Sequence, residues 1–199
     1  MANWASTSYA IEGPKETLQR IYNAIQHHPV EEDSSDAWEG NVLAALGIEW
    51  ERRELNSETL KPSGYYMRGF ISDDPWWDDN ESLRFNAEEA WGVTDFYVVL
   101  EKNLPDIKVF YVVEEPGEGI YATNDKEGKY FPDRYYVDTC INDNYQSEYF
   151  IEEKRVYEWL SYLTYGKVRT PEDVDSFNDK ADEEISDDFI YVHEFKIVE

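Results

Sequence analysis

The chain opens with a β-favouring stretch that runs directly into a helix-start signal. Residues 4–12 mix polar and β-favouring side chains and end at Gly13-Pro14. Proline is favoured at the first position of a helix, where its missing N–H would have no partner anyway. Apolar side chains then recur at helical spacing before the stop at Pro29, namely Leu18, Ile21, Tyr22 and Ile25. The pattern predicts a strand, a tight turn and an amphipathic helix.

Similar patterns continue through the middle of the chain. A short helix is expected between Asp36 and Gly47, with one face formed by Trp38, Val42, Leu43 and Leu46. The stretches 65–72 and 82–91 favour strands, and a helix is expected between a cap at Thr94 and a stop at Pro105. The β-branched and aromatic run "IKVFYVVEE" predicts a further strand. Glycines 117 and 119 then permit a turn into a hairpin.

The tail favours helices and a final strand. Ser147 is expected to cap a long helix that ends at Gly166, with an apolar side formed by Tyr149, Val156, Leu160 and Leu163. Thr170-Pro171 predicts the start of a second helix, because proline at the first position and acids in the first turn both favour a helix N-terminus. Alternating apolar residues over 187–199 predict a strand.

This order of elements predicts an α+β fold with a ferredoxin-like βαββαβ core, in which an antiparallel sheet carries helices on one face. We expect residues 1–140 to form this core, with a helical insertion at 31–63 and an extra hairpin. Residues 141–199 are expected to form an acidic helical extension with a final strand, packed on the core as one domain. A chain of 199 residues with 41% hydrophobic residues is long enough to bury a sizeable core.

The stretch "MANW", followed by a strand and a helix that starts at "GP", resembles the start of the YubB-type ferredoxin-like family. These are small proteins carried on phages, plasmids and other mobile elements of bacteria. The resemblance continues at "LRFNAEEAWGVTDFYVVLEKNLPDIKVFYVVEEPGEGIYATNDKEG" and covers roughly residues 1–140. It implies the ferredoxin-like fold and a mobile-element origin, and it supplies no catalytic residues. The family often has cysteine after the Asn-Trp pair, whereas this chain has Ala5.

Charge limits the partners that this chain can bind. It carries 44 acidic and 18 basic side chains, a formal net charge of −26 at pH 7. A field of that sign repels phosphate backbones and anionic membranes, so we expect no direct nucleic-acid binding and no membrane binding. A basic or DNA-binding protein is the natural complement. The sequence shows no apolar run that could span a bilayer and no signal-peptide pattern, which predicts a cytoplasmic location.

The sequence contains few residues in patterns typical of catalytic, cofactor-binding or metal-binding sites. Cys140 is the single cysteine, and neither the phosphate-loop nor the dinucleotide glycine pattern is present, so we expect no catalytic residue and no cofactor. His27 and His28, with the acids that follow them, could bind a transition metal, or the histidines could simply complement a helix C-terminus. The acids around Trp76-Trp77 could attract calcium, although the calcium-loop pattern is absent. No metal site is assigned on these grounds.

Two groups of residues are candidate partner-binding sites. The first combines acids with a tryptophan pair, and exposed tryptophans often anchor interfaces; it comprises Asp73, Asp74, Trp76, Trp77, Asp78 and Asp79. The second is an acidic run whose carboxylates could imitate the charge spacing of DNA, with a solvated surface as its alternative; it comprises Glu172, Asp173, Asp175, Asp179, Asp182, Glu183 and Glu184.

We therefore predict a non-enzymatic accessory protein of a bacterial mobile element that engages a basic or DNA-binding partner, with DNA mimicry as one way of doing so. Its acidic side chains and exposed aromatic rings would make the contacts. The alternative is a small metal-dependent enzyme or metal-binding module that uses the surface carboxylates.

Overall fold

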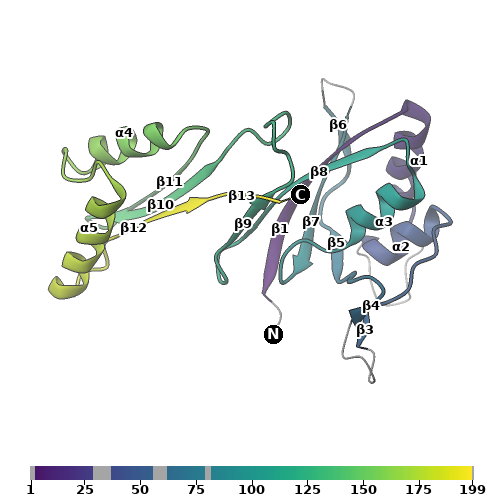
Figure 1. The fold of residues 1–199 in the computed structure, drawn as a ribbon, viewed down its shortest axis with the longest axis horizontal. Helices are drawn as coiled ribbons and strands as arrows, with labels where there is room; N and C mark the ends of the chain where they lie inside the picture. The colour runs from purple at the N-terminus through teal and green to yellow at the C-terminus, as the bar shows by residue number, and fades with distance from the viewer. Residues whose placement is uncertain (1–2, 29–36, 56–61, 79–81, 199) are drawn as a thin grey trace. The chain divides into compact units, whose positions relative to one another are not determined.

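The computed structural model describes residues 3–28, 37–55, 62–78 and 82–198 (Figure 1). It shows an α+β fold in which helices accompany mainly antiparallel sheets. The chain divides into two compact units, residues 1–120 and residues 121–199. The second unit thus begins before residue 140, because the strand that contains Cys140 pairs with strands from the tail.

An antiparallel sheet forms the first unit. Strand β1 (Trp4–Glu12) pairs with β7 (Leu83–Ala90) on one side and with β8 (Lys108–Glu115) on the other. Beyond β7 lie β5 (Gly69–Ile71) and then β2 (Ala37–Trp38), and β6 (Trp76–Trp77) also pairs with β7. The short strands β3 (Glu54–Leu55) and β4 (Pro62–Ser63) form a separate pair.

Three helices accompany this sheet: α1 (Lys15–Gln26), α2 (Glu39–Ala45) and α3 (Phe96–Asn103). Figure 1 shows all three on the same side of the strands. The core between them is aromatic, since Tyr9 stacks on Phe85 at 4.9 Å between ring centroids and meets Phe96 of α3 edge-on at 6.4 Å. Burial of such large rings supplies most of the driving force for folding.

The sequence patterns predict these elements well. The strand at 4–12, the helix after Gly13-Pro14 and the strand from Lys108 are confirmed. The Thr94 hydroxyl accepts a hydrogen bond from the N–H of Phe96 at 3.2 Å, so the expected capping contact exists, although α3 itself starts at Phe96. The strand expected over 65–72 is confirmed only for its last part, β5.

The second unit contains a three-stranded antiparallel sheet in which β10 (Tyr135–Ile141) lies between β11 (Asn144–Phe150) and β12 (Phe189–Glu194). Helices α4 (Glu153–Leu163) and α5 (Pro171–Glu184) pack on one face of it. The buried cluster between them comprises Val137, Val156, Leu160, Val168, Val174 and Ile190. Strand β13 (Lys196–Ile197) pairs in parallel with β9 (Ile120–Thr123).

The helix predicted from Ser147 is wrong at its start. Residues 144–150 form strand β11, and helix α4 begins only at Glu153. The reason is the preceding turn: Asn142 and Asp143 have φ values of 53° and 60°, the left-handed conformation that a two-residue hairpin requires. The turn folds residues 144–150 back onto β10, so Tyr149 lies opposite Tyr136 instead of facing a helix core.

The second predicted helix is confirmed. Helix α5 starts with a capping box, in which the N–H of Asp173 donates to the Thr170 hydroxyl and the Asp173 carboxylate accepts from the N–H of Thr170. Among the described residues, no helix is both long and apolar enough to cross a membrane.

One side chain ties α5 to the sheet. The Asn178 amide donates to the carbonyl of Ile190 at 2.8 Å and accepts from the N–H of the same residue at 2.9 Å. We expect Asn178→Ala to lower the free energy of unfolding of the second unit by about 1–3 kcal/mol, because two partly buried backbone groups lose their partners. Hydrogen exchange of the β10 and β12 amides measures this, with the exposed Ser176→Ala on the same helix as control. Equal exchange in both variants would contradict the assigned role.

Candidate functional site

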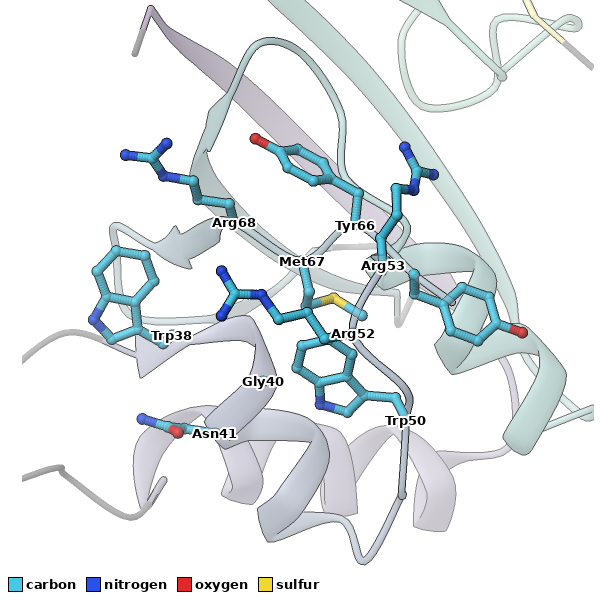
Figure 2. A pocket seen from close by; sticks show the side chains of 10 residues that line it. Trp38, Gly40, Asn41, Trp50, Arg52, Arg53, Tyr66, Met67 and Arg68 are labelled. Atoms are coloured by element: carbon cyan, nitrogen blue, oxygen red, sulfur yellow. The ribbon is translucent and has the colours of Figure 1, made fainter. Parts of the chain in front are cut away.

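Three segments of the first unit enclose a pocket of about 620 Å³ (Figure 2). They are the start of α2, the chain that follows α2, and residues 65–68 before β5. Its lining combines three guanidinium groups with two indole and two phenol rings and contains no carboxylate. The lining residues are Trp38, Gly40, Asn41, Trp50, Arg52, Arg53, Tyr65, Tyr66, Met67 and Arg68. We call this site the arginine–tryptophan pocket.

Backbone contacts hold these segments together. The N–H of Arg53 donates to the carbonyl of Tyr65, and the N–H of Tyr65 donates to the carbonyl of Glu51, both at 2.8 Å. Gly40 lets the Trp50 indole approach the start of α2, since a Cβ at position 40 would lie 3.0 Å from Trp50 Cζ2. The two walls of the pocket are therefore fixed by main-chain pairing and by close packing of one indole ring.

The three arginines differ in their partners. Arg53 donates to the Asp95 carboxylate at 2.8 Å and lies 5.7 Å from the centre of the Tyr66 ring, so its charge is compensated. Arg68 lies 5.8 Å from the Trp4 ring. Neither Arg52 nor Arg68 forms an ion pair with a carboxylate of the described residues, and Figure 2 shows the Arg52 side chain extended toward Trp38. These two side chains leave uncompensated positive charge in the pocket.

A buried pair of carboxyl groups lies beside this pocket. Glu39, between the pocket residues Trp38 and Gly40, and Glu89 of β7 are both fully buried. Glu39 Oε2 accepts from the Thr94 hydroxyl at 2.8 Å, while Glu89 Oε1 accepts from the Tyr9 hydroxyl at 2.8 Å and from the N–H of Thr94 at 2.9 Å. The remaining oxygens, Glu39 Oε1 and Glu89 Oε2, have no donor as long as both groups are ionised.

The surroundings of Glu39 favour the protonated form of its carboxyl group. Burial first, and then the charge of Glu89 and a hydrogen bond to it, raise the pKa of Glu39 well above its usual value. Two like charges at such a site cannot both ionise without a large penalty. The protonated form of Glu39, which carries no charge, is therefore favoured in the folded protein beside the pocket.

An adjacent depression carries charges of both signs. It shares Trp50 and Tyr65 with the arginine–tryptophan pocket and is also lined by Glu49, Glu51 and Lys102. Lys102 donates to the Tyr65 hydroxyl at 3.0 Å. The carboxylates of this depression thus share it with an ammonium group, whereas the charged groups that line the arginine–tryptophan pocket are all guanidinium groups.

The first predicted partner-binding group lies around β6, apart from the pocket lining. Trp76 and Trp77 are exposed, and Trp77 stacks on Tyr22 of α1 at 6.0 Å. Asp78 accepts from Arg84 at 3.1 Å, Asp73 from Asn86 at 3.0 Å and Asp74 from Gln26 at 3.0 Å. Asp79 lies outside the described residues. These three carboxylates accept hydrogen bonds from neighbouring side chains of the same unit, whereas the rings of Trp76 and Trp77 remain accessible to solvent.

The second predicted group lies on α5 in the other unit. Asp173 is used in the capping box, and Glu184 forms an ion pair with Lys180 at 3.5 Å. The other members are exposed, namely Glu172, Asp175, Asp179, Asp182 and Glu183. The helix thus presents most of these carboxylates to solvent.

The metal-site candidates are not assembled. Within the described ranges, no group of three or more histidine, cysteine or acidic side chains is placed to hold an ion. The Nδ1 atoms of His27 and His28 lie 3.1 and 2.8 Å from the carbonyl oxygens of Asn23 and Ile25 at the end of α1. Glu31, Glu32 and Asp33 lie outside the described residues.

Sequence reasoning missed the arginine–tryptophan pocket. The signal that could have found it is "WERRE", a pair of arginines after a tryptophan in a chain that is otherwise poor in bases. It also missed Glu39 and Glu89, because 44 acids create too many candidate pairs for any one of them to stand out. No family model, curated protein or solved structure matches the chain.

Proposed function

We propose that the protein binds a small anionic ligand with a planar ring, of which a nucleotide is the representative, in the arginine–tryptophan pocket. The observation that carries this proposal is the concentration of three arginines and no carboxylate in one pocket of a chain with a net charge of −26. Pockets of this size hold small ligands, and a few polar groups on aromatic walls commonly fix their orientation.

Each kind of side chain has a distinct part in this binding. Arg52 and Arg68 offer planar guanidinium groups, which match phosphate or carboxylate oxygens in a two-pronged geometry. Trp38 and Trp50 offer flat faces on which a base or another planar ring stacks. Arg53, held by Asp95, supports the wall formed by Tyr66. Asn41 supplies an amide for polar groups on the ring.

The overall charge of the chain does not prevent such binding. Charges that are exposed and more than about 8 Å away are largely screened at physiological salt. Guanidinium groups in direct contact with the ligand therefore dominate over distant carboxylates. A long nucleic acid would bring many phosphates close to the acidic surface, so a mononucleotide fits this site better than a polynucleotide.

Calorimetric titration with the four ribonucleoside monophosphates tests the proposal. We expect at least one to bind, and we expect Arg52→Ala and Arg68→Ala each to weaken it roughly 10- to 150-fold, the equivalent of about 1.5–3 kcal/mol for a charged hydrogen bond. Arg20→Ala is the matched control, because it removes the same charge from an exposed position on α1. Uncharged nucleosides should bind more weakly than the nucleotides.

Two results would contradict the proposal. One is the absence of binding by any of the four nucleotides at millimolar concentration. The other is an equal loss of affinity in the Arg20→Ala control, which would mean that only the overall charge matters. Competition by inorganic phosphate alone would show that the anion is recognised without the ring.

We further infer that the first unit is ferredoxin-like, as the resemblance to the YubB-type family implies. The strand order β8–β1–β7–β5, with α1 after β1 and α3 after β7, supports this inference, because the split βαβ arrangement has this order. Binding of a basic partner by the second unit also remains a proposal, supported by the exposed acids of α5.

A further inference from the structure

The outer edge of β12 carries backbone groups that pair with no strand in the described part of the chain. Residues 189–194 pair with β10, and the register places Ile190 opposite Thr139 and Val192 opposite Val137. Both hydrogen-bonding groups of Ile190 point away from β10, because they bond to the Asn178 side chain. Hydrogen-bonding direction alternates along an antiparallel strand. The N–H and C=O groups of Val192 and Glu194 therefore also point outward.

Nothing in the described residues pairs with this edge beyond Ile190. The sheet order is β11–β10–β12, so β12 has a neighbour on one side only. No backbone hydrogen bond to another described segment involves the outward groups of Val192 or Glu194. An edge of this kind is a template for another extended chain, and Asn178 blocks only its first position.

A groove of about 470 Å³ is lined by residues 190–194 of β12. The remaining lining residues are Tyr135 of β10 and residues from the N-terminal parts of α4 and α5. The lining includes the carboxylates of Glu153, Asp175 and Glu194, and it contains no lysine or arginine. Residues 121–199 together carry twenty acidic and nine basic side chains, so the surroundings reinforce this sign.

Tyrosine rings complete the lining. Burial first, and then the charges of Glu194 and Glu153, raise the pKa of Tyr135. Burial, followed by the charges of Glu153, Glu172 and Asp175, raises the pKa of Tyr157. The charges of several carboxylates thus affect the same tyrosine side chains of the groove. A cationic side chain there would meet carboxylates and the faces of tyrosine rings together, and both attract it.

We propose that an extended protein segment carrying lysine or arginine side chains binds along β12 as an added strand. Its main chain pairs with the outward groups of Val192 and Glu194, and its cationic side chains enter the groove beside Glu153 and Asp175. Main-chain pairing supplies affinity in this mode of recognition, while the pocket on the side selects the residues. A second copy of this chain would bring like charges together at the same edge.

This site is independent of the arginine–tryptophan pocket, so each proposal can fail without the other. The probe is a ten-residue peptide of alternating threonine and lysine, titrated into the full chain and followed by amide NMR. In the free protein, we expect the amides of Val192 and Glu194 to exchange faster than those of Tyr191 and His193, which face β10. Peptide binding should slow exchange at Val192 and Glu194 at least tenfold.

Two matched peptides separate strand addition from simple charge attraction. Methylation of alternate backbone nitrogens keeps every charge and removes the donors for pairing, and we expect it to weaken binding at least tenfold. Replacement of lysine by glutamate should abolish binding. The variants Glu153→Gln and Asp175→Asn should each weaken binding several-fold, whereas Asp182→Asn, an exposed α5 residue outside the groove, should leave it unchanged.

Three results would overturn the proposal. The methylated peptide could bind as tightly as its parent, the protected amides could lie away from β12, or the lysine peptide could fail to bind at millimolar concentration. The variant Val192→Pro tests strand addition in a second way. It removes an outward N–H that the sheet does not use, so loss of peptide binding with an intact amide spectrum supports strand addition, and retained binding contradicts it.

Discussion

Replacement of Glu39 by glutamine is expected to stabilise the first unit above about pH 5, by an amount that grows as the pH rises. Burial and the neighbouring Glu89 raise the pKa of Glu39, so the folded protein keeps a proton on this carboxyl that the unfolded chain has lost. The folded state then binds more protons than the unfolded state, and stability falls with rising pH. Below the unfolded pKa of the group, its full contribution is present.

Glutamine keeps the contacts and removes the titration. Its carbonyl oxygen can accept from the Thr94 hydroxyl as Glu39 Oε2 does, and its NH₂ group can donate to Glu89 Oε2, which has no other donor. The difference in unfolding free energy between Glu39→Gln and the unsubstituted protein should therefore increase with rising pH, by at most about 1.4 kcal/mol for each pH unit for one proton.

Denaturant titrations between pH 5 and pH 8.5 measure this difference. Six of the seven tryptophans lie in residues 1–120, so tryptophan fluorescence mainly follows the first unit. Glu16→Gln on the exposed side of α1 controls for the loss of one carboxyl group. A constant difference between Glu39→Gln and the unsubstituted protein across this range would mean that Glu39 is ionised in the folded state.

Gly69→Ala is expected to destabilise the first unit by about 2–5 kcal/mol. A Cβ on Gly69 would overlap Glu39 Oε1 and would lie 2.7 Å from Glu39 Cδ and 2.8 Å from Glu89 Cγ. These atoms cannot move aside freely, because both carboxyl groups are fully buried and bonded to Thr94. Overpacking a core commonly costs 1–3 kcal/mol, and a broken buried hydrogen bond adds about as much.

A comparison of variants isolates this clash. Gly47→Ala meets no atom within 4 Å and pays only for its left-handed backbone at φ 75°, about 1–2 kcal/mol. The double variant Glu39→Ala/Gly69→Ala should lose less stability than the sum of its single variants, because the methyl group then occupies vacated space. Denaturation followed by tryptophan fluorescence gives all four values. Strictly additive losses would show that Gly69 and Glu39 do not interact in this way.

Local patterns predicted the elements whose signals are short-range. Gly13-Pro14 places the start of α1, and Thr170 with Asp173 forms the capping box of α5. The helix expected from Ser147 failed because its apolar residues fit two periods, and the hairpin turn at Asn142-Asp143 decided between them. The residue types of such a turn indicate it only weakly, whereas its positive φ values at two successive residues reverse the chain direction and pair the flanking strands.

The candidate sites were harder to predict than the elements. Arg52 and Arg68 are separated along the chain by residues that the sequence does not mark, and the backbone pairing of residues 51–53 with Tyr65 brings their segments together. Glu39 directly follows β2, and Glu89 lies on β7. The two residues come together because β5 pairs with β7 and β2 pairs with β5. Carboxylates are so common in this chain that neither residue could be selected in advance.

The sequence by itself determined the α+β class, the positions of most helices and strands, and the strongly negative net charge. These depend on side-chain period, capping residues and composition, all of which act over a few neighbours. Only the tertiary structure decided that three arginines share one pocket, that Glu39 and Glu89 are buried together, and that β12 has a neighbouring strand on one side only among the described residues. Each of these arises from residues far apart in the chain that strand pairing and burial bring into contact, and no local pattern encodes those contacts.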